Sequence, residues 1–470
     1  MTDTRPTDPG APTPGPTTTA AWAASLHPEC PDVSRLGPTP AEGLLRARAA
    51  RVRLDREQRQ ELWRGGFTRR RFLAGGLAGV AALGTQLVTT RVSFAAPGAA
   101  AAETGTLVVI FMRGGVDGLS MLVPVDDPAL VDARPDIAIP GSALLPLDGR
   151  FGLHPALAPL HAHWGRGQLT AVPAVSTTDV SRSHFQAQDC LERGGAASGT
   201  VEGWLDRVLD RLGPGSTFRA IGQGSTLPRS LAGDQSALSL NSIEAFGLAG
   251  WEGVHDKTIL ALTTLYTGFE HSLSQDVAAT LSALDTAETL TAAEYQPAAT
   301  YPDGDFAKGL TELARLIKAD VGLRVACIDV GGWDMHTNIG TLDGGSMKDQ
   351  LTSFGEALGA FAADLGPALG DVTVVAMTEF GRRVEQNANR GTDHGHGSVV
   401  LLLGGGLAGG ATHGDWPGLA PDARDQGDVA GANDSRDVLG DVVAGRLGLS
   451  AADVAAIFPD HQYRPLGIMA

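Results

Sequence analysis

Side chains that could bind a metal ion or take part in acid–base chemistry are concentrated between residues 377 and 406. This stretch reads MTEFGRRVEQNANRGTDHGHGSVVLLLGGG and begins and ends in apolar runs. Its charged and imidazole side chains are Glu379, Arg382, Arg383, Asp393, His394 and His396. The glutamate and the arginines follow the first run, where they suit a structural or substrate-binding role. The histidines directly precede the second run, so we predict a metal-binding or active-site loop with the histidines as ligands.

A second pair of candidate ligands, Asp334 and His336, lies in the motif GGWDMHTN. The motif follows the apolar run LRVACIDV, so both residues stand on a glycine-led loop after a predicted strand. An irregular loop would let both side chains turn towards one ion. Carboxylate and imidazole together suit Zn, Mn or Fe better than Ca or Mg. We expect His394, His396 or both to face this pair across the edge of a sheet.

Two further motifs offer other chemistry. Ser183 and Gln186 fit a capping box, which predicts that Ser183 begins a helix. The backbone N–H groups there suit an anion or an activated oxygen nucleophile, and a serine that merely caps the helix is the alternative. Arg182 and His184 flank this serine. Asp117 lies on the glycine-rich turn RGGVDGL, where it either acts in the site or hydrogen bonds the amides of its own turn.

Apolar runs bounded by glycine and polar residues predict the strands that position these motifs. The runs span 106–112, 169–175, 218–221, 237–240, 323–330 and 371–377, with a last buried parallel strand from Ser398. Helical patterns span 151–164, 201–212, 257–290, 306–319, 351–365, 437–447 and 451–457. This alternation predicts an α/β fold whose parallel strands place polar residues at one edge, where ligands bind. Acidic and histidine residues at successive strand ends favour metal-assisted hydrolysis.

Composition limits the classes of function. The chain has 470 residues, of which 43% are hydrophobic, so it can bury a sizeable core. Its net charge of -17 argues against nucleic acid as a partner, because phosphate backbones are bound by clustered Lys and Arg. Cys30 lies in the leader, and Cys190 and Cys327 have no CxxC spacing, which argues against a structural zinc site. The apolar run around Cys327 favours a buried free thiol, with a disulfide as the alternative.

The N-terminal region has the organisation of an exported protein. Residues 1–67 are too poor in large apolar residues to fold alone, so we expect a disordered extension. Residues 68–95 resemble a twin-arginine signal, with TRRRFLA, a weakly apolar stretch and a small-x-small cleavage site. We therefore expect the twin-arginine export machinery as a partner, a periplasmic, extracellular or cell-surface location, and no stable membrane span in the mature chain. An N-terminal helix of a cytoplasmic protein is the alternative.

The order of the motifs is specific. RGGVDGL, SRSHF, GGWDMHTN, TEFGRR and GTDHGHG, behind a twin-arginine leader, resemble the bacterial exported family called domain of unknown function 1501. The resemblance covers about residues 106–447. It implies the alkaline phosphatase and sulfatase superfamily, with a three-layer α/β sandwich and a mostly parallel central sheet flanked by helices. We expect a single such domain over 96–470, with a partly helical insertion around 213–305.

The resemblance also implies a divalent metal site, with two ions in the superfamily, and an oxygen nucleophile that attacks a phosphate or sulfate ester. The implied metal ligands are Asp117, Asp334, His336, Asp393, His394 and His396. The implied catalytic candidates are Ser183, Arg182, His184, Glu379 and Arg382, with Arg383 as a further anion-binding candidate and Ser120 as a second candidate nucleophile.

Two departures keep two functions open. Superfamily enzymes place an acidic ligand at the end of the first strand, whereas Arg113, Gly114 and Gly115 precede Asp117 here. They also carry Asp-His immediately after a strand, whereas Thr378-Glu379-Phe380 follows Met377 here and Asp393-His394 comes just before the next strand. We favour a metal-dependent hydrolase of small-molecule or polymer esters. The alternative is a non-catalytic exported protein that uses a degenerate superfamily fold to bind a surface polymer or a partner protein.

Overall fold

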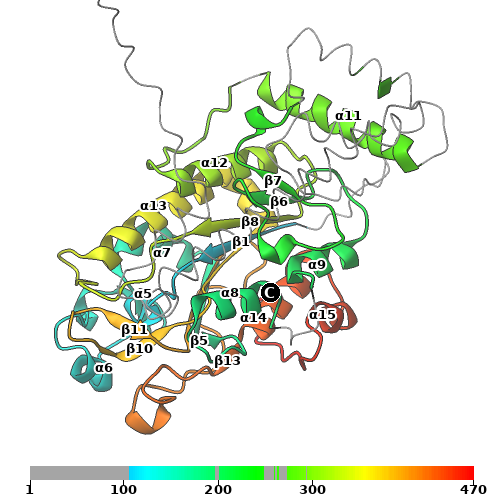
Figure 1. The fold of residues 1–470 in the computed structure, drawn as a ribbon. Helices are drawn as coiled ribbons and strands as arrows, with labels where there is room; N and C mark the ends of the chain where they lie inside the picture. The colour runs from blue at the N-terminus through cyan, green and yellow to red at the C-terminus, as the bar shows by residue number, and fades with distance from the viewer. Residues whose placement is uncertain (1–104, 196–200, 248–258, 260–261, 264–271, 293) are drawn as a thin grey trace, which may run out of the picture.

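The computed structural model describes part of the chain (Figure 1). The described residues are 105–195, 201–247, 259, 262–263, 272–292 and 294–470. The expected N-terminal extension and twin-arginine segment lie outside them. In the part of the chain that is described, no helix is both long and apolar enough to cross a membrane.

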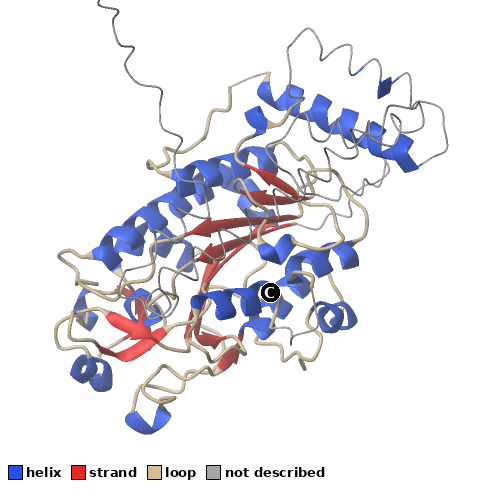
Figure 2. Cartoon of the chain, viewed as in Figure 1, coloured by secondary structure: helices blue, strands red, loops and turns tan. Residues whose placement is uncertain are grey.

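An eight-stranded sheet forms the centre of the fold (Figure 2). Its strands lie in the order β13-β5-β12-β9-β1-β8-β6-β7. In that order they span Asn433–Asp434, Leu169–Ser176, Ser398–Gly404, Val372–Met377, Thr106–Met112, Val325–Val330, Ala220–Gln223 and Leu238–Leu240. Every residue of β1, β5, β9 and β12 is buried, as continuous apolar runs predict. The expected α/β fold with a mostly parallel sheet is confirmed.

The direction of β12 differs from the prediction. The apolar run from Ser398 was expected to be parallel, but β12 is antiparallel to both β5 and β9. An apolar run reports burial on both faces of a sheet and carries no information about direction. The reversal places the start of β12 at the sheet edge where β5 and β9 end.

Helices cover both faces of the sheet and make a three-layer structure. Along β1, Val108 and Ile110 join the core of one face, and Leu107 and Val109 join that of the other, because side chains alternate along a strand. The first face is covered by α7 (Ala158–Trp164), α12 (Asp305–Lys318) and α13 (Ser346–Leu365). The second is covered by α8 (His184–Glu192), α9 (Trp204–Leu212), α14 (Ser435–Leu447) and α15 (Ala451–Ile457).

Smaller elements surround the sheet edge. A three-stranded sheet comprises β2 (Leu122–Pro124), β4 (Phe151–Leu153) and β3 (Leu145–Pro146), and a hairpin comprises β10 (Arg382–Gln386) and β11 (Thr392–His394). The short helices are α5 (Gly118–Met121), α6 (Pro128–Ala133), η1 (Gly141–Ala143), η2 (Pro155–Leu157), η3 (Arg229–Leu231), η4 (Ile243–Ala245), η5 (Gly366–Asp371) and η6 (Pro421–Ala423).

The observed elements differ from the predicted ones in two regions. The single helix expected over 151–164 is divided into β4, η2 and α7, because Pro155 favours extended backbone at the residue before it. In the region around 213–305, β6 and β7 extend the central sheet, and α11 (Ser272–Thr291) packs against η4. Cys190 and Cys327 are free thiols, and Cys327 is buried, as its apolar surroundings predict.

A buried histidine, His154, begins η2. Its Nδ1 accepts a hydrogen bond from the Ala156 amide at 3.0 Å, and the residue is 2% exposed. Burial, together with the positive charge of Lys348, lowers the pKa of His154 to about 4. The ring is therefore neutral in the folded chain near neutral pH.

Candidate metal centre

Residues from distant parts of the chain meet at the edge where the parallel strands end. Asp334 and His336 follow β8, Glu379 follows β9, and His184 begins the helix after β5. His394 ends β11, immediately before β12. Because β12 is antiparallel to its neighbours, its first residues lie at this same edge. The loop that carries His394 therefore arrives beside the loops that follow β8 and β9.

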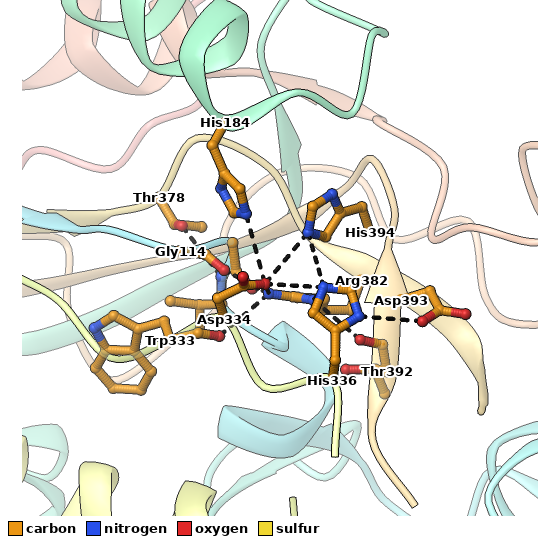
Figure 3. A network of polar contacts seen from close by, with 12 residues as sticks. Gly114, His184, Trp333, Asp334, His336, Thr378, Arg382, Thr392, Asp393 and His394 are labelled. Carbon is orange, nitrogen blue, oxygen red and sulfur yellow. Dashed lines mark hydrogen bonds and ion pairs between the residues drawn. The ribbon is translucent and has the colours of Figure 1, made fainter. Parts of the chain in front are cut away.

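Three imidazole rings surround the Asp334 carboxylate (Figure 3). Oδ1 of Asp334 lies 3.0 Å from His336 Nε2, 3.3 Å from His394 Nε2 and 3.5 Å from His184 Nε2. None of these four residues is more than 6% exposed. The ligand atoms of His184, Asp334 and His394 all lie within 4.8 Å of one another. We call these three residues the ligand triad.

The second ring nitrogen of each histidine faces an oxygen. His184 Nδ1 lies 2.8 Å from Glu379 Oε1, and His394 Nδ1 lies 2.8 Å from the Arg182 carbonyl oxygen. His336 Nδ1 lies 3.2 Å from Asp393 Oδ1. Carbonyl and carboxylate oxygens accept hydrogen bonds, so each Nδ1 donates to its oxygen partner. With its only proton on Nδ1, a ring can offer the Nε2 lone pair to a metal ion, whereas without a metal ion a proton on Nε2 can donate to Asp334. Partners of this kind fix the orientation of metal-ligating histidines.

This donor arrangement fits a divalent metal ion. His336 Nε2 and His394 Nε2 lie 3.0 Å apart, and both lie close to a carboxylate oxygen. Lone pairs and a carboxylate at such distances repel one another unless a cation or added protons lie among them. Imidazole and carboxylate ligands suit Zn, Mn or Fe. Within the described residues, the triad is the one group of at least three His, Cys, Asp or Glu side chains that converges in this way.

Asp334 is held in its ionised form. Burial opposes ionisation of this carboxyl group, but hydrogen bonds from the three histidines and the charge of Arg382 lower its pKa far below the ordinary value. Arg382 Nη2 donates to Oδ1 at 2.7 Å. The carboxylate is therefore available as a ligand across the physiological pH range.

Glu379 is fully buried and orients His184. Its Oε1 accepts hydrogen bonds from His184 Nδ1, the Gly114 amide at 2.9 Å and Gln188 Nε2 at 2.8 Å. Thr378 Oγ1 donates to Oε2 at 2.9 Å. Burial alone would raise the pKa of Glu379, but the hydrogen bonds from His184 and Gln188 lower it to about 2. The carboxylate thus connects the end of β1 with the first turn of α8.

Arg382 is buried at the centre of the same edge. Its Nε donates to the Gly115 carbonyl at 2.6 Å, and its Nη2 donates to the Gly114 carbonyl at 2.5 Å. Its Nη1 donates to the Thr392 carbonyl at 3.0 Å and lies 3.3 Å from His336 Nε2. The guanidinium is therefore fixed against the triad on the side of His336.

Asp117 and Ser120 are placed differently from the predicted ligand and nucleophile positions. Arg134 Nη1 and Nη2 donate to Asp117 Oδ2 and Oδ1 at 2.6 and 2.8 Å, and Ser120 Oγ donates to Oδ2 at 2.5 Å. Burial opposes ionisation of Asp117, but Arg134 and Ser120 lower its pKa. Both carboxylate oxygens have protein partners, so the observed role is an ion pair that holds the turn after β1.

Ser183 caps α8 without the predicted capping box. It is the N-cap residue, but its side chain makes no hydrogen bond to the start of the helix. Its amide instead donates to Ser181 Oγ at 3.1 Å, and Ser181 is itself bound to Asp179. The Ser183 amide, which Gln186 would accept from in a capping box, is thus bound by Ser181 of the preceding turn. Ser183 remains adjacent to the triad residue His184.

Arg182 acts on the triad through its backbone. Its φ of 55° lies in the left-handed region, which is uncommon for a residue with a side chain. The guanidinium donates to buried Asp428 Oδ2 through Nε at 2.9 Å and Nη2 at 2.5 Å. This pair fixes the carbonyl that accepts from His394 Nδ1. In this geometry the guanidinium is directed at Asp428 rather than at the triad.

His396 and Arg383 contact the neighbouring loop at 424–431. His396 Nδ1 lies 3.5 Å from the Asp425 carboxylate, and Arg383 Nη2 donates to the Gln426 carbonyl at 2.9 Å. Neither belongs to the converging group of ligands. Of the two histidines expected to face Asp334, the structure brings His394 to it.

Three residues of the site were not anticipated from the sequence: Gln188, Arg134 and Asp428. Gln188 lies one helical turn after His184, and this i,i+4 spacing could have identified it. Arg134 and Asp428 stand in no motif, because their partners are distant in sequence or have no fixed spacing.

A family model described as "Protein of unknown function (DUF1501)" matches residues 151–430. The chain belongs to this family. The DUF1501 match includes all three triad residues, His184, Asp334 and His394. Curated proteins give no match to this DUF1501 chain.

Two solved structures resemble the DUF1501 chain weakly. One is a Vibrio parahaemolyticus protein described as belonging to the alkaline phosphatase superfamily, with 11% identity, a TM-score of 0.32, and coverage of 81% of this chain and 75% of that chain. The other is the alkaline phosphatase from the Antarctic bacterium TAB5, with 10% identity, a TM-score of 0.23, and coverage of 66% of this chain and 95% of that chain.

Proposed function

We propose that the protein is an exported metal-dependent hydrolase of phosphate or sulfate esters. The observation that carries the proposal is the convergence of two imidazole Nε2 atoms and a carboxylate oxygen in the ligand triad, with each Nδ1 fixed by an oxygen acceptor. Three protein ligands leave a coordination position open for water or substrate, which is the arrangement of catalytic rather than structural zinc sites.

The residues around the triad have separable roles. His184, Asp334 and His394 would hold the ion, and Glu379 and the Arg182 carbonyl orient the two rings. A bound divalent ion would polarise the ester and stabilise the charge that develops during attack. Hydrolysis transfers the phosphoryl or sulfuryl group to water and releases the ester oxygen as an alcohol.

Ser183 is the candidate nucleophile. It directly precedes His184 at the start of α8, and its hydroxyl makes no hydrogen bond to the helix start. Backbone N–H groups at a helix start favour a nearby anion. Export through the twin-arginine pathway belongs to the same proposal and rests on the sequence of residues 68–95.

The experiment combines metal analysis with activity. The purified full chain is analysed for Zn, Mn and Fe and assayed on aryl phosphates and aryl sulfates, before and after treatment with a chelator. We expect bound metal, hydrolysis of one ester class, and loss of activity on chelation with recovery on reloading.

His394→Ala should abolish metal binding. His161→Ala is the matched control, because His161 lies on α7 and contacts the Pro146 carbonyl of β3, away from the triad. A protein without metal and without activity on both ester classes contradicts the proposal.

Burial favours a second candidate, a non-catalytic protein in which the metal is structural. The triad residues are between 0% and 6% exposed, whereas a substrate must reach an open coordination position. This candidate predicts bound metal, unfolding on chelation, and no hydrolysis of either ester class. The first candidate instead predicts an inactive chain that stays folded after brief chelation.

A further inference from the structure

Arg382 places a permanent cation against the ligand triad. Its Nη2 donates to Asp334 Oδ1 at 2.7 Å, and its side chain is 0% exposed. We infer that this guanidinium takes the place of a second metal ion, so that the site binds one divalent ion per chain. The inference rests on the proposed metal-dependent function and specifies how the site is charged.

The guanidinium is held in place independently of any bound ion. Besides Asp334, it donates to the carbonyl oxygens of Gly114, Gly115, Thr392 and Trp333. These carbonyls belong to segments that follow β1 and β8 and to β11. The folded sheet edge itself therefore surrounds the guanidinium with acceptors. Moving the guanidinium away would leave buried carbonyls without donors, which costs roughly 1 to 3 kcal/mol for each unsatisfied group. Arg382 is therefore a fixed part of the site.

Arg382 also contacts His336, which stands outside the triad. Arg382 Nη1 lies 3.3 Å from His336 Nε2, so the guanidinium can donate to the lone pair that a ligand would offer. The other nitrogen of His336 faces Asp393. A second ion near His336 would have to occupy space next to a positive charge.

The buried formal charges of the cluster favour one divalent ion over two. Asp334 and Glu379 contribute one negative charge each, and Arg382 contributes one positive charge. The Asp393 side chain is 53% exposed, so its carboxylate is screened by solvent. One divalent ion would leave a net charge of +1, whereas a second would leave +3 in a buried site, which is strongly unfavourable.

Neighbouring charges do not alter this balance. Asp117 is paired with Arg134, and Glu192 is paired with Arg113 at 2.7 Å, so both buried pairs are neutral. The Asp329 carboxylate also contacts Arg113, but its side chain is 44% exposed and is screened by solvent.

The first test is the metal stoichiometry of the unmodified chain. The purified full-length protein is stripped with a chelator, loaded with excess Zn or Mn, freed of unbound ions by gel filtration, and analysed for metal and protein. One ion per chain supports the inference. Two ions per chain overturn it and leave the proposed function standing. No retained ion overturns the proposed metal-dependent function itself.

The second test changes the charge. Arg382→Gln removes the cation and keeps only the two N–H donors of an amide. Because the positive charge next to the triad is lost, we expect metal affinity to rise at least tenfold in a competition titration with a chelator. An unchanged or lowered affinity would mean that Arg382 only supports the loop structure, and would overturn the charge role. Arg207→Gln is the matched control. Arg207 also donates to three backbone carbonyls, those of Ile457, Glu202 and Arg193, and its loss should leave metal affinity unchanged.

Discussion

Replacing Glu379 by glutamine tests the geometry of the site most directly. The substitution keeps the size of the side chain and one acceptor oxygen, but it removes the charge that attracts the His184 Nδ1 proton. An orienting partner of this kind contributes roughly 10- to 100-fold to metal affinity, which corresponds to about 1.4 to 2.8 kcal/mol. We therefore expect Glu379→Gln to weaken Zn or Mn binding by that factor.

The same substitution changes stability in a defined pH range. The pKa of Glu379 is about 2 in the folded chain and 4.5 in its unperturbed state. A lowered acid pKa contributes stability above the unfolded value, of the order of 3 kcal/mol, and this is lost as pH falls from about 4.5 to about 2. Glu379→Gln should lower stability at pH 7 and flatten the stability profile in this acidic range.

The assay separates these two effects. Metal affinity is measured by competition with a chromophoric chelator, and the free energy of unfolding of the metal-free chain is measured in urea at several pH values. Glu312→Gln serves as a matched control, because Glu312 accepts from the Ile243 amide and lies on α12. If Glu379→Gln folds and binds metal within twofold of the unmodified chain, Glu379 does not orient a ligand, and our assignment of His184 is refuted.

Three further predictions follow from the same geometry. Asp428→Asn weakens the ion pair that holds Arg182, whose carbonyl accepts from His394 Nδ1. Metal affinity in the same titration should therefore fall about tenfold. Unchanged affinity would contradict this positioning role. His154→Asn keeps the acceptor at the start of η2 and removes the titrating ring. Between pH 6.5 and about 4, the free energy of unfolding of the metal-free variant should therefore fall by about 1 to 3 kcal/mol less than that of the unmodified chain. An unaltered urea profile would argue against this contribution of His154. Ser183→Ala should reduce ester hydrolysis at least 100-fold with metal content unchanged; full activity would exclude this serine as nucleophile.

The directions of the pH effects follow from the pKa shifts. For His154 the folded pKa lies below the unfolded one, so the neutral ring stabilises the fold above about pH 6.5 and loses that contribution as pH falls towards 4. For Glu379 the loss occurs at lower pH. The two acid transitions can therefore be separated in one titration.

The sequence predicted the elements more completely than their contacts. The apolar runs located β1, β5, β8 and β9 to within a residue or two, because continuous burial requires continuous apolar side chains. The convergence of Asp334 and His394 followed from motifs at strand ends. Family membership followed from five ordered motifs and is confirmed by the family model.

Features that depend on contacts between distant segments were not predictable. Asp117 stands on a glycine turn that suits a ligand, yet its partner is Arg134, a residue without any motif. Arg182 was expected to bind an anion, and its guanidinium is instead directed at buried Asp428. Local patterns show which groups are present, whereas the direction of a side chain depends on which opposite charge the fold brings nearest.

The reversed direction of β12 determines whether the ligand group can exist. Had β12 been parallel to β9, the connection between them would have ended at the opposite edge of the sheet, and His394 would stand about 20 Å from Asp334, the length of a seven-residue strand. Because the connection returns to the edge it left, Glu379, Arg382 and His394 enter the structure on one short hairpin-containing segment. Closing a loop of this length costs little chain entropy. His184 and Asp334 join only through long-range strand pairing, so we expect the local hairpin to form before the distant histidine reaches it.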